Sequence, residues 1–99
     1  MLRRVVLWRL RATEPEQKAL DAGTIKRALE SMRGKIPGLI NIQVGVNTAQ
    51  MADASDVVMI VDFDDEQALA VYEKHPVHEQ VKPIVGPLRD ERRVVEYTF

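Results

Sequence analysis

The chain has 99 residues, 45% hydrophobic and 29% charged, which is the composition of an ordinary globular protein, and we expect one domain covering residues 1–99. Its net charge of −1, from 14 basic and 15 acidic residues, provides no overall field for nucleic acid or a membrane surface, so neither is expected as a partner. The absence of cysteine excludes disulfides, thiolate catalysis and cysteine-ligated metal.

The chain opens with a predicted strand over residues 2–11, because side chains of two kinds alternate there. One face carries Leu2, Arg4, Val6, Trp8 and Leu10. A helix start follows. Thr13 is expected as the N-cap, with Glu16 three residues later as its capping-box partner, and Pro15 lies in the first turn. Gly34 suits the left-handed residue that ends this helix.

Two further strands are predicted. Between Leu39 and Asn47, apolar and polar residues alternate, as in an edge strand of an antiparallel sheet with one buried (dry) face and one solvent-exposed face. The dry face would carry Ile40, Ile42, Val44 and Val46. Residues 57–63 are apolar on both faces, which predicts a central strand that is covered on two sides. Too few helices remain to supply both covers, so we expect a second subunit to provide one of them.

The joint at residues 72–78 holds both histidines and one of the two tyrosines. Asp64 is expected to cap the helix before it, and Pro76 ends that helix because the residue preceding a proline is pushed out of helical geometry. A second helical segment then places one stripe on a common side, with His78 one position off it: Val77, Val81, Ile84, Val85 and Leu88. Residues 92–99 form the last strand. The two arginine groups (Arg3, Arg4, Arg9 and Arg11; Arg89, Arg92 and Arg93) are interpreted mainly as solvated strand ends.

The resulting order is strand, helix, strand, strand, helix pair, strand. We therefore predict an α+β, ferredoxin-like βαββ(αα)β fold, in which a four-stranded antiparallel sheet carries its helices on one face. This plan, the doubly apolar third strand and the His-Pro-x-His joint resemble the stress-responsive dimeric α+β barrel family. The matching pieces are Arg4–Leu10, Ile36–Gly38, Val61–Phe63, and Tyr72, His75, Pro76 and His78 of the joint.

The resemblance implies a homodimer in which two sheets pack face to face to form the dimeric α+β barrel. The face concerned would carry Val5, Leu7, Val58 and Ile60. Members of the olivetolic acid cyclase type close a linear polyketide by an aldol condensation without a cofactor, using a tyrosine and a histidine that match Tyr72 and His78. Histidines of their pocket fall at Arg4 and Val57 here, and an aromatic falls at Leu29, so this pocket would differ in shape and polarity.

On this reading a small carbonyl or phenolic molecule enters a cleft between sheet and helices and is converted by cofactor-independent acid–base chemistry. His78 would remove a proton next to a carbonyl, and Tyr72 would orient that base or donate to the developing enolate. Arg4 would hold an anionic oxygen. The other candidate ligand-binding residues are Trp8, Leu29, Val57, Met59 and His75.

Other readings stay open. The protein could be a non-catalytic, stress-related dimer with a packed cleft, in which His75 is a helix cap and Tyr72 a core aromatic. His78 could instead bind haem. Side-chain metal ligation is not expected, because Pro76 separates the two histidines, whereas family relatives suggest a cation held by backbone carbonyls within Met32–Gly38.

The start of the chain is too short and too charged for a signal peptide, and no apolar run approaches the roughly 20 residues that a membrane helix needs. We therefore expect a cytoplasmic location.

Overall fold

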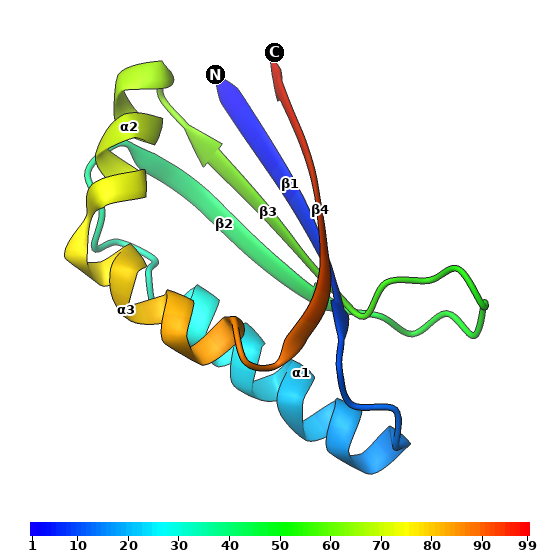
Figure 1. Ribbon diagram of the computed structural model, residues 1–99. Helices are drawn as coiled ribbons and strands as arrows, with labels where there is room; N and C mark the ends of the chain where they lie inside the picture. The colour runs from blue at the N-terminus through cyan, green and yellow to red at the C-terminus, as the bar shows by residue number, and fades with distance from the viewer.

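The computed structural model describes residues 1–99 as a sheet of four antiparallel strands with three helices on one face (Figure 1). The strands are β1 (Leu2–Leu10), β2 (Leu39–Val46), β3 (Val57–Phe63) and β4 (Arg89–Thr98), in the order β2-β3-β1-β4. The helices are α1 (Pro15–Glu30), α2 (Glu66–Lys74) and α3 (Pro76–Val85). The predicted ferredoxin-like α+β fold is confirmed. No helix combines the length and the apolar content needed to cross a membrane.

The core lies between the sheet and the helices. Alternate side chains of the two central strands point into it, and Val6, Val61 and Phe63 are fully buried. From α1, Ile25 and Leu29 close the core from the other side. Arg4 is the one charged side chain in the inward-facing row of β1, and it lines a pocket between the sheet and the helices.

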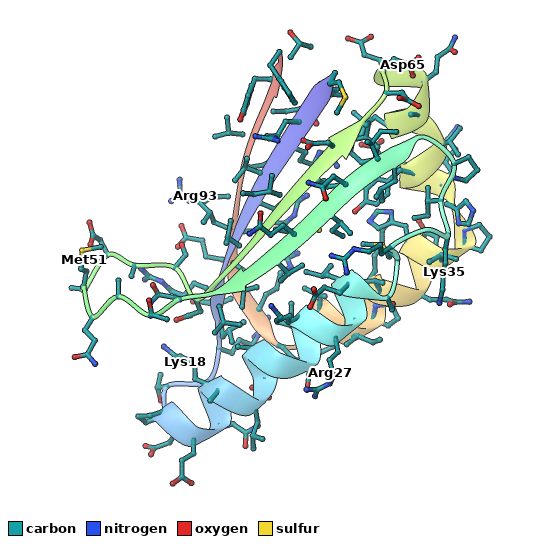
Figure 2. All side chains as sticks on the ribbon, turned by 180° about the vertical axis from the view of Figure 1, so that it is seen from behind. Lys18, Arg27, Lys35, Met51, Asp65 and Arg93 are labelled. Atoms are coloured by element: carbon teal, nitrogen blue, oxygen red, sulfur yellow. The ribbon has the colours of Figure 1, made fainter.

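The other face of the sheet has no helix over it. Val5, Leu7, Val58 and Ile60 lie side by side on this face, because Val5 pairs with Ile60 and Leu7 pairs with Val58. The edge strand β4 adds Val95 opposite Val5, and Figure 2 shows Arg93 projecting from the sheet on the side away from the helices. We call this surface the open face.

Two helix starts differ from the sequence-based prediction. Helix α1 is preceded by Glu14, which makes no side-chain cap, so the bond expected from Thr13 does not form. Pro15 occupies the first helical turn and holds the residue before it in extended geometry. Helix α2 is capped by Asp65, whose carboxylate accepts from the Ala68 N–H at 2.9 Å, and not by Asp64. The Asp64 N–H instead donates to the Gly38 carbonyl at 3.0 Å, which keeps Asp64 outside the helix.

Two strands also differ in detail. A register shift between Leu39 and Asn41 turns Ile40 out to solvent, so the prediction that Ile40 shares the dry face of β2 is wrong. Val46, at the end of β2, is exposed as well. Strand β4 begins at Arg89, not at residue 92, because it pairs along the whole of β1 and so includes a charged stretch without alternating apolar residues.

The predicted stripe of α3 is narrower than expected. Val81 and Val85, one turn apart, are buried, whereas Ile84 is exposed. The prediction that Ile84 joins the buried side is therefore wrong, whereas Val77 and Leu88 of the predicted stripe are partly buried against the core.

Candidate functional site

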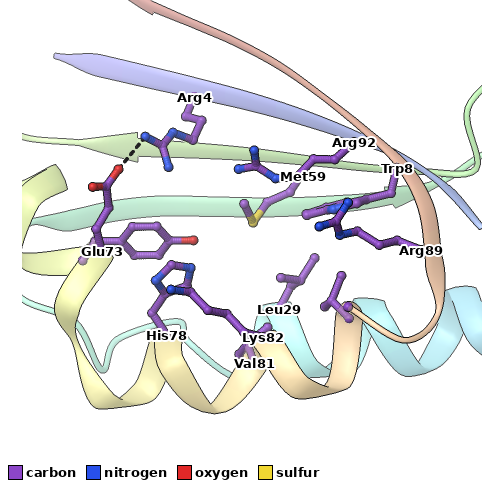
Figure 3. Close-up of a pocket in the computed structure, with 13 residues that line it drawn as sticks. Arg4, Trp8, Leu29, Met59, Glu73, His78, Val81, Lys82, Arg89 and Arg92 are labelled. Carbon is purple, nitrogen blue, oxygen red and sulfur yellow. Dashed lines mark hydrogen bonds and ion pairs between the residues drawn. The ribbon is translucent and has the colours of Figure 1, made fainter.

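A pocket of about 520 Å³ lies between the sheet and helices α2 and α3, within the usual range for small-molecule sites (Figure 3). Six residues singled out from the sequence line it: Arg4, Trp8, Leu29, Met59, Tyr72 and His78. Two others do not, namely Val57, which is buried beside Trp8 in the sheet, and His75. Side chains thus leave part of the space between the sheet and helices α2 and α3 unfilled.

The sheet supplies one wall of the pocket. Arg4 and Trp8 lie four residues apart on β1 and therefore point to the same face, at a separation of about 13 Å along the strand. Met59 comes from the neighbouring strand β3, and Leu29 from α1 provides the floor. This part of the wall is thus charged at Arg4 and apolar at Met59 and Trp8.

The break between α2 and α3 places the aromatic pair. His75 ends α2 in extended geometry, and its Nδ1 accepts a hydrogen bond from the Val77 N–H at 3.1 Å, which caps α3. Pro76 then opens α3, and the change of direction brings the imidazole of His78 onto the ring of Tyr72. The two rings are stacked, with centroids 4.1 Å apart and an interplanar angle of 22°.

Tyr72 is 2% exposed and packs on its other side against Phe63, with ring centroids 5.0 Å apart. Burial raises the pKa of its phenol to about 12, although the guanidinium groups of Arg4 and Arg92 act in the opposite direction. The hydroxyl therefore carries its proton near neutral pH. It makes no hydrogen bond within the chain, so it is free to donate to a molecule in the pocket.

The imidazole of His78 is placed to act as a base. Burial and the nearby Lys82 ammonium lower its pKa below the usual 6.5, against smaller effects of the backbone at Glu73 and Tyr72. The ring is therefore neutral at pH 7. Its Nδ1 is buried and has no hydrogen-bond partner, and no bond joins it to the hydroxyl of Tyr72. The ring is thus held by its stacking on Tyr72 and lies close to the backbone of Glu73 and Tyr72.

Arg4 connects three elements at the pocket rim. Its guanidinium donates to Glu96 of β4 at 2.7 Å and to Glu73 of α2 at 2.9 Å, the second of which is drawn in Figure 3. Its side chain is only 15% exposed. Arg4 thus ties the helix that carries Tyr72 to the sheet, and its charge is already matched by carboxylates.

Sequence reasoning missed four charged residues that line the pocket, namely Glu73, Lys82, Arg89 and Arg92. Arg89 and Arg92 were expected to be solvated strand ends. The register of β4 with β1 sets Arg92 opposite Trp8, on the face that looks toward the helices. Arg92 lies within the strand predicted over residues 92–99, but it was interpreted as a solvated strand end. Arg89 shares its face only because of the register shift between Arg9 and Leu10, for which the sequence carries no signal.

A metal site in this chain would use ligands of one of two kinds, side chains or the backbone carbonyls of Met32–Gly38. No group of three or more His, Asp or Glu residues is arranged to hold a metal ion. In the segment proposed for a backbone-bound cation, the carbonyls of Met32, Ile36 and Gly38 already accept backbone N–H groups. A cation there stays a prediction.

The chain is similar to known proteins in both sequence and architecture. The family model for the Stress Responsive A/B Barrel Domain matches residues 2–99. No curated protein matches the chain significantly.

Among solved structures, one is a dimeric protein of unknown function with a ferredoxin-like fold from Bacteroides fragilis. It has 27% identity and a TM-score of 0.85 over 99% of this chain and 95% of that one. A dimeric ferredoxin-like protein of unknown function from Thermobifida fusca has 24% identity and a TM-score of 0.82 over 99% and 90%. A hydroxynitrile lyase from Passiflora edulis has 13% identity and a TM-score of 0.78 over 97% and 90%, a likeness of fold alone.

Proposed function

The chain belongs to the stress responsive A/B barrel domain family, and on that premise we propose that it binds a small carbonyl or phenolic molecule in the Tyr72–His78 pocket and acts on it by acid–base chemistry without a cofactor. The observation that carries the proposal is the stacked pair itself. It combines a neutral imidazole with a protonated phenol, and both line one pocket of about 520 Å³.

The two groups differ in what they offer a substrate. A neutral imidazole accepts a proton, so His78 would take one from the carbon next to a carbonyl or from a hydroxyl. The Tyr72 phenol keeps its proton up to a pKa of about 12, so it would donate a hydrogen bond to the oxygen on which negative charge develops. Since no bond joins the two, each is free to contact a different atom of the substrate.

The sheet wall would position the substrate between them. Met59 and Leu29 offer apolar contacts, and Trp8 lies at the end of the wall away from Arg4. A protein with this fold is a hydroxynitrile lyase, which supports the view that such a pocket can serve small-molecule conversion. The reading with a packed cleft is disfavoured by the pocket's volume.

We also propose that the protein is a homodimer through the open face. The two bacterial relatives are dimeric, and Val5, Leu7, Val58 and Ile60 form an apolar surface that no helix covers. Packing two such sheets together would bury this surface and leave the pocket, on the other side of each sheet, accessible.

Proton–deuterium exchange tests the chemistry. We expect the wild-type protein to accelerate exchange of the acetyl methyl protons of 4-hydroxyacetophenone in D2O, followed by NMR. General-base catalysis contributes roughly 10²–10⁴-fold, and His78→Ala should remove it. His75→Ala is the matched control, since that histidine lies outside the pocket and should matter only for stability. Exchange at the buffer rate, or an unimpaired His78→Ala variant, would overturn the proposal.

A further inference from the structure

The charges around the pocket are unevenly paired. Arg4 contacts Glu73 and Glu96, and Lys82 contacts Glu79 at 2.8 Å. Arg89 and Arg92 also line the pocket, but no carboxylate forms a salt bridge with either side chain. The pocket therefore contains two positive charges that the chain itself does not neutralise.

These two arginines are held in place by the sheet. The register of β4 fixes Arg92 opposite Trp8 and Arg89 opposite Leu10, and the Arg11 Nε donates to the Arg89 carbonyl at 2.8 Å. Figure 3 shows Arg89 beside Trp8 and Arg92 reaching over Met59 toward the middle of the pocket. Both guanidinium groups thus line the pocket, Arg89 at its Trp8 end and Arg92 nearer its middle.

The electrostatic environment of Arg92 points the same way. Burial, and then the like charges of Arg4 and Arg89, lower the pKa of its guanidinium. The opposing effect of the Glu73 carboxylate, which raises this pKa, is smaller. An anion between Arg89 and Arg92 would relieve this repulsion. A carboxylate suits the planar fork of a guanidinium best, because it can accept two parallel hydrogen bonds.

We infer that the ligand of this pocket is a small aromatic carboxylic acid, whose carboxylate binds Arg89 and Arg92 while its ring lies over Met59 and its carbonyl or phenol group meets Tyr72 and His78. This inference rests on the proposed function and adds the substrate class to it. It also assigns ligand-binding roles to two residues outside the aromatic pair. The pocket volume of about 520 Å³ leaves room for a single substituted ring with both groups.

Two probes that differ only in charge test the inference: 4-acetylbenzoate and the neutral 4-acetylbenzamide, titrated by calorimetry. We expect the acid to bind wild-type protein about 10- to 100-fold more tightly than the amide, the usual value of a charge-assisted hydrogen bond. Arg92→Gln and Arg89→Gln should each remove most of that advantage and leave the amide unaffected. Arg27→Gln, an exposed arginine on α1, is the control that loses the same charge elsewhere.

The outcomes separate the two proposals. If acid and amide bind equally and both weaken in His78→Ala, the pocket is a site but the carboxylate subsite is refuted. If the acid binds better but equally well to Arg27→Gln, Arg89→Gln and Arg92→Gln, its anion is bound elsewhere and the subsite is again refuted. If neither probe binds and 4-hydroxyacetophenone exchanges at the buffer rate, both proposals fall.

Discussion

At the scale of single residues, the unusual feature is a histidine that is stacked on a tyrosine instead of bonded to it. In most acid–base pairs a hydrogen bond sets the tautomer and direction of the imidazole. Here the ring of His78 is held by its 4.1 Å stacking on Tyr72, and its Nδ1 has no partner. Both rings line the pocket, where a bound molecule can contact them.

The pH dependence follows from the environment of His78. Because burial and Lys82 lower the pKa of His78, we expect the exchange rate to be constant at neutral pH and to fall only below pH 6.5, as the imidazole gains a proton. Replacing Lys82 by Gln removes a positive charge that disfavours the protonated ring, so the fall should move to higher pH. A rate profile measured for wild type, Lys82→Gln and the exposed-site control Lys35→Gln checks this. A midpoint at or above 6.5 in the wild type would contradict the assignment of His78 as the base.

At the scale of elements, the sequence was sufficient wherever apolar periodicity was regular. The alternation in β1 and the doubly apolar β3 identified the two central strands, and the His-Pro step located the break that brings Tyr72 and His78 together. Both features depend on local physics: a period of two in a strand, and a proline that cannot follow a helical residue without strain.

The sequence-based prediction was wrong where tertiary contacts determine the start of an element or the face that a residue occupies. Asp64 and Asp65 are equally good caps in isolation, and only the bond from the Asp64 N–H to Gly38 selects Asp65. The bulge that exposes Ile40 and the early start of β4 both arise from pairing with a neighbouring strand. The late predicted start of β4 concealed Arg89 as a pocket residue, whereas Arg92 was missed because it was interpreted as a solvated strand end.

The contact between the turn before β2 and helix α2 gives a stability prediction. Gly38 has a φ of 81°, and a Cβ there would lie 2.4 Å from the Cβ of Ala68. Gly38→Ala should therefore lower the free energy of unfolding by about 2–5 kcal/mol, through strain and overlap together. Gly34, with a φ of 74° and no atom within 4 Å, is the matched control, and its change to alanine should cost only about 1–2 kcal/mol. Urea unfolding measures both, and equal losses would show that the overlap with Ala68 is unimportant.

At the scale of the whole molecule, the two faces of the sheet have separate tasks. One face, with the helices, forms the core and the pocket, while the open face presents apolar side chains to the outside. A chain of 99 residues has a modest core, and covering the open face would add buried apolar surface.

Dimer formation can be tested on that face. Leu7→Glu would place a carboxylate in the apolar surface of both copies, so we expect the protein to shift from dimer toward its monomer mass of 11.2 kDa in light scattering. Leu20→Glu makes the same change at a more exposed leucine of α1, away from the open face, and should leave the mass unaltered. A Leu7→Glu variant that keeps the dimer mass would place the interface elsewhere.

The most direct measurement is an NMR titration of the ¹⁵N-labelled protein with 4-acetylbenzoate, because it locates the ligand as well as detecting it. We predict that the perturbed amides cluster around the pocket, at Met59, Tyr72, His78 and Arg92, and that the perturbations persist in His75→Ala but weaken in His78→Ala. Perturbations spread over the open face or the outer side of α1, or none at all at millimolar ligand, would contradict the claim that this pocket is the functional site.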